Sequence, residues 1–170
     1  MHRLTAQSIW QCLLPCLFLT ACARPIAAPQ PQVFRNPQAP IYSSAVLTPQ
    51  RLAGHWVQVA GFGPGGVLPC GPGFVDIADG KVTWRLCLDT ERSGSGPIVP
   101  GKPGRFAVTG LADLWVLWVD GDDRTLVIGT PSGQFGFVLN RQAGLPPDRL
   151  RAVRDILTFN GYDLAAFRAF

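Results

Sequence analysis

Three features of the sequence carry side chains that could do chemistry: a pair of cysteines, a histidine and an acidic run. Cys70 and Cys87 are close enough in the chain to form a disulfide or to supply thiolates to a metal ion. His55 stands beside a tryptophan and has the functional group of a general base or a metal ligand. The run "DGDD" at 120–123 holds carboxylates of the kind that bind calcium.

The surroundings of these residues favour structural roles over catalysis. A metal site built from Cys70, Cys87 and His55 would lack a fourth ligand and any C-x-x-C spacing. The acidic run lacks the spacing and the terminal glutamate of an EF-hand loop, so it indicates a solvated hairpin turn. The sequence also has no G-x-S-x-G, no H-E-x-x-H and no phosphate-binding loop. We therefore predict no catalytic residue, no metal site, no cofactor and no enzymatic activity.

The N-terminal stretch "MHRLTAQSIWQCLLPCLFLTACARP" predicts export from the cytoplasm. A basic start precedes an apolar run from Leu13 to Leu19, which is shorter than a membrane span and suits an export signal. The end of the run, Leu19-Thr20-Ala21-Cys22, resembles a bacterial lipoprotein signal. This resemblance implies that residues 1–21 are removed and that lipid chains such as palmitate are attached to Cys22. Because no acidic residue follows the cysteine, it also implies the outer membrane of a Gram-negative bacterium, facing the periplasm. The alternative is an ordinary signal peptide with an incidental cysteine.

The cysteine count then predicts a disulfide. Cys12 and Cys16 would leave with the signal and Cys22 would be acylated, which leaves Cys70 and Cys87 as a pair in an oxidising compartment. Their disulfide would close a loop of 18 residues, both cysteines included. Closing a loop of that length stabilises a fold by about 3 kcal/mol.

Composition and hydrophobic patterning predict a domain rich in strands. There are 19 glycines and 16 prolines, and charged residues make up only 15% of the chain, which favours short strands and many turns. The net charge of +4 comes from scattered basic residues, so nucleic acid is not an expected partner. We divide the chain into a signal peptide at 1–21, a proline-rich tether at 22–50, an antiparallel β-barrel at 51–145 and a C-terminal helix with its tail at 146–170. The helix would pack on the outside of the barrel.

Three short motifs carry a resemblance to a known family. They are "GHW" from Gly54 to Trp56, "VDGDD" at 119–123 and "VLNR" ending at Arg141. In this order, and with a helix after them, they resemble the lipocalins, most closely those that are bacterial outer-membrane lipoproteins. The resemblance implies an all-β, up-and-down barrel in which Gly54, Trp56, Asp122 and Arg141 are structural. It also implies that Arg141 stacks on Trp56 at one end of the barrel.

The length of the barrel region predicts a shortened, divergent relative of these proteins. The span from Gly54 to Arg141 contains two glycine- and proline-rich stretches, at 61–73 and 91–104, that we predict to be loops. The remaining residues suffice for six or seven strands, and the strand expected between "RFAVTG" and "LADLWVLWV" is missing from the pattern. The barrel would then be shallow, open on one side or patched by the tether.

The resemblance also implies that the inner face of the barrel binds a small apolar molecule. Strand parity directs nine side chains inward as candidate ligand contacts: Trp56, Gln58, Trp84, Leu86, Leu114, Val116, Trp118, Phe135 and Phe137. We expect a lipid-anchored periplasmic protein that binds or carries fatty acids or other lipids and holds them without chemical change. The alternative is a filled barrel that acts as a structural or interaction lipoprotein, for which the sequence identifies no protein partner.

Overall fold

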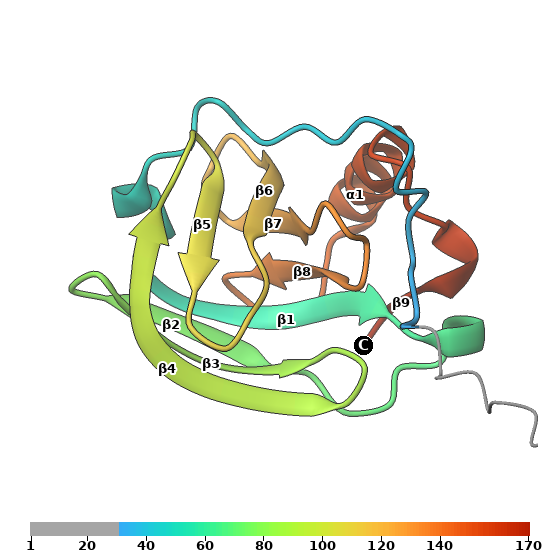
Figure 1. Cartoon of the computed structure of the whole chain (residues 1–170), viewed down its shortest axis with the longest axis horizontal. Helices are drawn as coiled ribbons and strands as arrows, with labels where there is room; N and C mark the ends of the chain where they lie inside the picture. Colours follow the sequence, from blue (N-terminus) through green and yellow to red (C-terminus); the bar gives the residue numbers. More distant parts are fainter. Residues whose placement is uncertain (1–30) are drawn as a thin grey trace, which may run out of the picture. The chain divides into compact units, whose positions relative to one another are not determined.

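The computed structural model describes residues 31–170, and the nine strands in this part of the chain form one antiparallel sheet (Figure 1). The strands follow one another in the sheet in chain order from β2 to β8, then β1 and β9. Because β2 also pairs with β1, strands β1 to β8 close into a barrel. The strands are β1 (Gly54–Phe62), β2 (Phe74–Ala78), β3 (Lys81–Cys87), β4 (Glu91–Pro100), β5 (Arg105–Val108), β6 (Leu114–Val119), β7 (Thr125–Gly129), β8 (Gly136–Asn140) and β9 (Phe167–Ala169). The predicted all-β, up-and-down barrel is confirmed.

The barrel has eight strands, so the expectation of six or seven strands and an open side is wrong. The strand that we did not predict is β4, which lies in the stretch 91–104 that we predicted to be a loop. It precedes "RFAVTG", and no strand lies between "RFAVTG" and "LADLWVLWV", where we expected one. The sequence of β4 lacks apolar alternation because Gly94 lies directly under the indole of Trp84: a Cβ at Gly94 would come within 2.8 Å of that ring. A glycine in the strand makes room for a large side chain of the neighbouring strand, at the cost of the hydrophobic pattern that identifies strands.

Strand β1 holds the barrel closed and is shared among three partners. One edge of β1 pairs with β8, as Val57 opposite Asn140 and Gly61 opposite Phe137 show. Its other edge pairs with β2 along Gly54–Val57, and then with β9 along Ala60–Phe62. The C-terminal tail therefore completes the sheet along the second half of β1.

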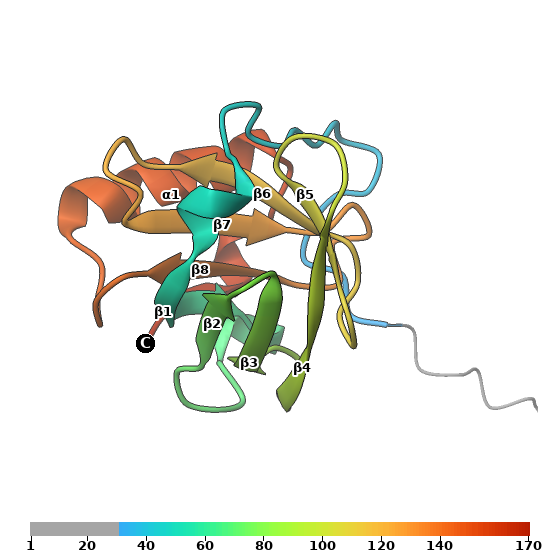
Figure 2. The same cartoon turned by 90° about the vertical axis from the view of Figure 1, so that its left-hand side faces the viewer.

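The predicted C-terminal helix is confirmed as α1 (Pro147–Phe159), which lies outside the barrel beside β7 and β8 (Figure 2). Val153 and Leu157 of α1 are fully buried in an outer core, against Val127 of β7 and Val138 of β8. A separate inner core fills the barrel. Strands β7 and β8 are buried along their whole length because one face meets the inner core and the other meets α1. Among residues 31–170, none of the helices has the length and apolar character needed to cross a bilayer.

The second half of the predicted tether at 22–50 packs against the barrel. Phe34 is buried in the outer core, and Arg35 forms a bridge with Tyr162, which follows α1. Farther along, Leu47 is buried in the inner core, just before the short 3-10 helix η1 (Pro49–Leu52) that leads into β1. Two further 3-10 turns, η2 (Pro64–Gly66) and η3 (Leu164–Ala166), lie in the connections next to β1 and β9. The predicted signal peptide and Cys22 lie outside the described residues.

Candidate functional site

One end of the barrel, which we call the base, is covered by Trp56. Its indole is fully buried, and Nε1 donates a hydrogen bond to the carbonyl oxygen of Leu52 in η1 at 2.7 Å. Cζ of Arg141 lies 3.5 Å from the centroid of the Trp56 ring, so the guanidinium stacks on the indole. Gly54 has φ of +100°, and a Cβ there would lie 3.0 Å from a guanidinium nitrogen of Arg141. Glycine at this position therefore satisfies both the backbone conformation and the close approach of the arginine.

Arg141 ties together three segments that meet at the base. Its guanidinium donates to the carbonyl oxygens of Arg51 in η1 (3.3 Å), His55 in β1 (3.1 Å) and Asp123 between β6 and β7 (3.3 Å). Burial lowers the pKa of Arg141 from its ordinary value, and the nearby carboxylate of Asp123 partly offsets this effect. These contacts join backbone segments to one another, so the role of Arg141 at the base is structural.

The turn between β6 and β7 is held by Asp120 and Asp123, and the predicted Asp122 is exposed to solvent. Oδ1 of Asp120 accepts hydrogen bonds from the backbone N–H groups of Arg124 (2.6 Å) and Thr125 (2.9 Å). Asp123 accepts from Nε of Arg51 at 2.8 Å, and this hydrogen bond lowers the pKa of its carboxyl group. The motif predicted Asp122 as the structural carboxylate, but the next residue, Asp123, pairs with Arg51. Neither the position of Arg51 nor the fold of the turn could be predicted from the motif.

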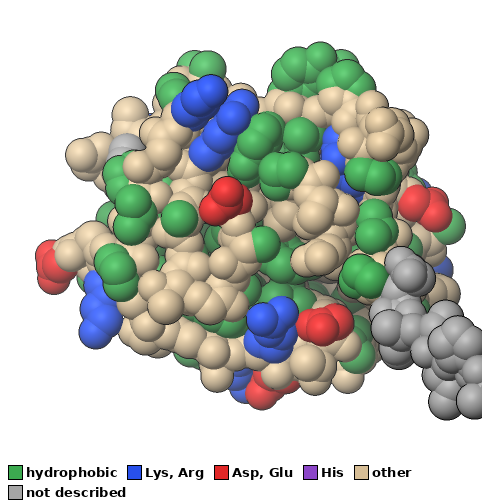
Figure 3. Space-filling view, in the orientation of Figure 1, with side chains coloured by type: hydrophobic (Ala, Val, Ile, Leu, Met, Phe, Trp, Pro, Cys, Tyr) green, Lys and Arg blue, Asp and Glu red, His purple; other side chains and the backbone are tan. Residues whose placement is uncertain are grey.

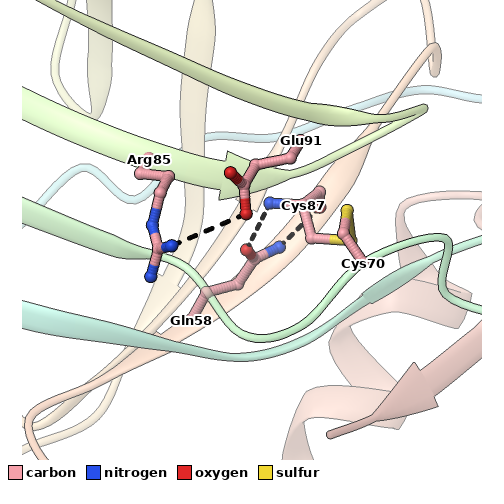
Figure 4. Close-up of a disulfide and its surroundings, with 5 residues drawn as sticks. All are labelled: Gln58, Cys70, Arg85, Cys87 and Glu91. Carbon is pink, nitrogen blue, oxygen red and sulfur yellow. Dashed lines mark hydrogen bonds and ion pairs between the residues drawn. A yellow bond between two sulfur atoms is a disulfide. The ribbon is translucent and has the colours of Figure 1, made fainter.

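The predicted disulfide between Cys70 and Cys87 is confirmed, and Gln58 lies beside it (Figure 4). It links the long connection between β1 and β2 to the end of β3. The amide of Gln58 is fully buried and makes two hydrogen bonds of 2.8 Å with the backbone N–H and carbonyl of Cys87. Gln58 therefore acts as a substitute for backbone pairing between β1 and β3, and it does not line the cavity as predicted.

His55 lies on the outer surface of the barrel, where it pairs with Asp76 of β2. Its Nδ1 is 2.6 Å from Oδ1 of Asp76, and both side chains are about half exposed. The hydroxyls of the next two strands in the same row, Thr83 and Ser95, bond to each other. Within residues 31–170, no group of three or more His, Cys, Asp or Glu side chains comes together as a candidate metal site.

The barrel interior encloses a cavity of about 40 Å³. Sixteen side chains line it, all of them apolar or aromatic, and they come from η1, the β5–β6 connection and every barrel strand except β1. Five of the nine predicted ligand contacts are among them: Trp84, Leu86, Leu114, Val116 and Phe137. The remaining lining residues were not among the nine predicted ligand contacts: Leu52, Val75, Ile77, Val82, Ile98, Phe106, Val108, Leu111, Leu126, Ile128 and Leu139.

The other predicted contacts lie at the ends of the barrel or outside it. Trp56 forms the base, and Phe135 belongs to the inner core next to Phe137, with ring centroids 6.3 Å apart, without lining the cavity. The prediction that Trp118 contacts a ligand inside the barrel is wrong, because Trp118 packs in the outer core against α1. A register shift between Val116 and Trp118 places Leu117 and Trp118 on the same outer face. A bulge of this kind reverses the inward and outward alternation for every later residue in the strand.

The surface of the barrel carries few charged groups, as the face shown in Figure 3 illustrates. On this face, Lys and Arg side chains occur singly or in pairs, with Asp and Glu side chains between them. The electrostatic footprint of a nucleic-acid-binding protein is a continuous basic stripe, and this face does not have one.

The closed eight-stranded barrel, the base built from Trp56 and Arg141 and the helix outside the wall define a lipocalin fold. The family model of the lipocalin-like domain matches residues 103–170. Among solved structures, the chain is similar to the major allergen Per a 4 from cockroaches, with 10% identity and a TM-score of 0.54 over 79% of this chain and 94% of that one. It is also similar to apocrustacyanin C1, with 17% identity and a TM-score of 0.50 over 77% and 88% of the two chains, and to lobster apocrustacyanin A1, with 16% identity and a TM-score of 0.48 over 71% and 77%. At these identities the likeness concerns the fold. A comparison with curated protein sequences finds no match.

Proposed function

We propose that this protein binds or carries small hydrophobic molecules inside the barrel, and that it does so without catalysing a reaction. The observation that carries the proposal is the cavity in the barrel interior, whose sixteen lining side chains are all apolar or aromatic. Such walls bind alkyl and acyl chains through burial of apolar surface, at about 25 cal/mol for each Å² removed from water. The alkyl and acyl chains of lipids are the groups that this chemistry favours.

The size of the cavity limits what the barrel accepts without movement. A cavity of about 150 Å³ accepts benzene in other proteins, whereas this one measures about 40 Å³. A ligand must therefore displace side chains, and the candidates are partly buried residues that pack against the inner core, such as Ile98, Leu111 and Leu114. The small volume also favours the second candidate, a filled barrel with a structural or interaction role.

A fluorescence titration distinguishes these two functions. We expect the uncharged hydrophobe N-phenyl-1-naphthylamine to show saturable enhancement of its emission with the purified protein, and decanol to displace it. The variant Leu86→Ala enlarges the cavity and should bind the probe more tightly, because more volume becomes free at the wall.

The matched control is Leu157→Ala, which removes an equally buried leucine from the outer core under α1. It should leave the affinity for the probe unchanged, and a thermal melt of each variant shows whether it is folded. If the wild-type protein gives no saturable signal at any concentration of the probe, the filled-barrel role replaces the binding role.

We also propose that the protein is lipid-anchored at the outer membrane and faces the periplasm. The motif Leu19-Thr20-Ala21-Cys22 behind an apolar run supports this location, and a stable anchor requires more than one acyl chain. When the full chain is expressed in a Gram-negative host with radioactive palmitate, we expect label in the mature protein and none in Cys22→Ser. Equal labelling of wild type and variant, or no labelling of either, would contradict an anchor at Cys22.

A further inference from the structure

The indole nitrogen of Trp84 has an unusual environment. Among the buried side-chain nitrogen and oxygen atoms of residues 31–170, Nε1 of Trp84 is the one that lacks a hydrogen-bond partner. The side chain is only 2% exposed, so solvent does not satisfy the donor either. Buried polar groups are nearly always paired, and an unpaired one requires an explanation. By contrast, Nε1 of Trp56 at the base is paired with a carbonyl oxygen.

Trp84 belongs to the wall of the cavity. Its indole leans from β3 across the inner face of β4, where the ring edge that includes Nε1 lies over Gly94. The ring also extends towards Gly110, in the connection between β5 and β6: a Cβ there would be 3.5 Å from Cζ2 of Trp84. The two glycines leave the space that the indole occupies. The unpaired donor thus belongs to the side chain that spans β3, β4 and the β5–β6 connection.

A trapped water molecule is a poor partner for this donor. A buried water needs between about two and four polar partners, and every other side chain that lines the cavity is apolar. The cavity surface exposes no polar atom, and Nε1 lies at the edge of the ring over Gly94. A ligand that displaces neighbouring side chains, as the small cavity requires, could reach this donor if it brings one acceptor atom and is otherwise apolar.

We infer that the ligand of this barrel is an uncharged hydrophobic molecule with one hydrogen-bond acceptor, such as a carbonyl, ester or ether oxygen, and that Nε1 of Trp84 donates to it. The inference rests on the proposed binding function and names the class of ligand. The acceptor must be neutral, because none of the sixteen lining residues carries a positive charge that could compensate a buried carboxylate.

A cation that could pair with an anionic ligand lies at the end of the barrel opposite the base. Arg92 of β4 donates to the carbonyl of Gly110 at 3.4 Å and lies 3.8 Å from a carboxylate oxygen of Asp89. Its side chain is 43% exposed, so a carboxylate bound to Arg92 would remain at the surface. Arg92 and Trp84 therefore select for different ligands, and substitutions can separate their effects.

Three small molecules of similar shape test the inference on the purified protein by NMR. Ethylbenzene has no acceptor, acetophenone has a carbonyl in place of a methylene group, and benzoate carries a charge. We expect acetophenone to shift the indole proton of Trp84 downfield, and ethylbenzene to shift the inner methyl resonances but not that proton. In Trp84→Phe, the affinity for acetophenone should fall about tenfold, and the affinity for ethylbenzene should stay within about twofold.

The controls keep each outcome interpretable. Trp115→Phe changes a tryptophan that stacks on Arg105 outside the barrel, so it should bind both ligands like the wild type. If Trp84→Phe does not fold, the shift of the wild-type indole proton on addition of acetophenone still tests the inference. This proton can be assigned because it lies close to the α-protons of Gly94.

Two results would overturn the inference and leave the binding function standing. In the first, both neutral ligands bind, but the indole proton does not move and Trp84→Phe has no effect on acetophenone. In the second, benzoate binds most tightly and Arg92→Gln abolishes its binding, which places the polar contact at the end opposite the base. If none of the three ligands perturbs the inner methyl groups, the proposed function and this inference fail together.

Discussion

The substitution Trp56→Ala should lower the free energy of unfolding by about 3–5 kcal/mol, the range for removing a buried tryptophan. Trp56 is fully buried, so its loss leaves a void at the base that the neighbouring side chains cannot fill completely. It also removes the surface on which Arg141 stacks, a contact worth about 0.5–2 kcal/mol, and a hydrogen bond to Leu52. Urea unfolding monitored by circular dichroism measures the change.

Trp115 provides a matched control for this variant. Cζ of Arg105 lies 3.6 Å from the centroid of the Trp115 ring, a stacking geometry close to that at the base, but Trp115 is on the outer face of β6 and only partly buried. Trp115→Ala should therefore cost clearly less than Trp56→Ala. Similar losses for the two variants would mean that stacking, and not closure of the barrel end, accounts for the effect, and the structural role of the base would be wrong.

Removal of the disulfide through Cys70→Ala and Cys87→Ala together should lower the free energy of unfolding by about 3 kcal/mol. The bond fastens the connection between β1 and β2, residues 63–73, to the end of β3, with Cα atoms 5.5 Å apart. Without it the unfolded chain gains conformational freedom. The hydrogen bonds of Gln58 to the backbone of Cys87 do not depend on the sulfur atoms, so the barrel should still fold.

The comparison is made under oxidising and reducing conditions. Dithiothreitol should shift the urea midpoint of the wild type to that of the double variant, and it should leave the double variant unchanged. An identical midpoint for oxidised wild type and double variant would show that the disulfide contributes nothing to stability.

The sequence predicts those parts of the fold that need a particular type of residue at a particular position of a strand or helix. Gly54, Trp56 and Arg141 could be found because a strand start, a large ring and a strand end have characteristic residue types. The helix could be found because Val153 and Leu157 recur at helical spacing beyond a pair of prolines. The cysteine pair could be found by counting, once the other three cysteines had been assigned to the predicted signal peptide and the predicted lipidation site.

The parts that the sequence concealed depend on contacts between strands. Strand β4 contains Gly94 because the indole of Trp84 occupies the space that a side chain would need. The residues next to Gly94 in the sequence do not predict this contact. The bulge at Leu117 has no local signal in an apolar run, so parity placed Trp118 on the wrong face. Gln58 was predicted as a ligand contact because its true partner, the backbone of Cys87, is 29 residues away in the sequence.

The pairing of β9 with β1 has a consequence for how the molecule is made. The N–H group of Phe170, the last residue of the sequence, donates to the carbonyl oxygen of Val59, and Phe167 is buried against the outer core. The second half of β1 therefore keeps an unpaired edge until β9 has been synthesised and has docked on it. Until then this edge is open to pairing with other chains.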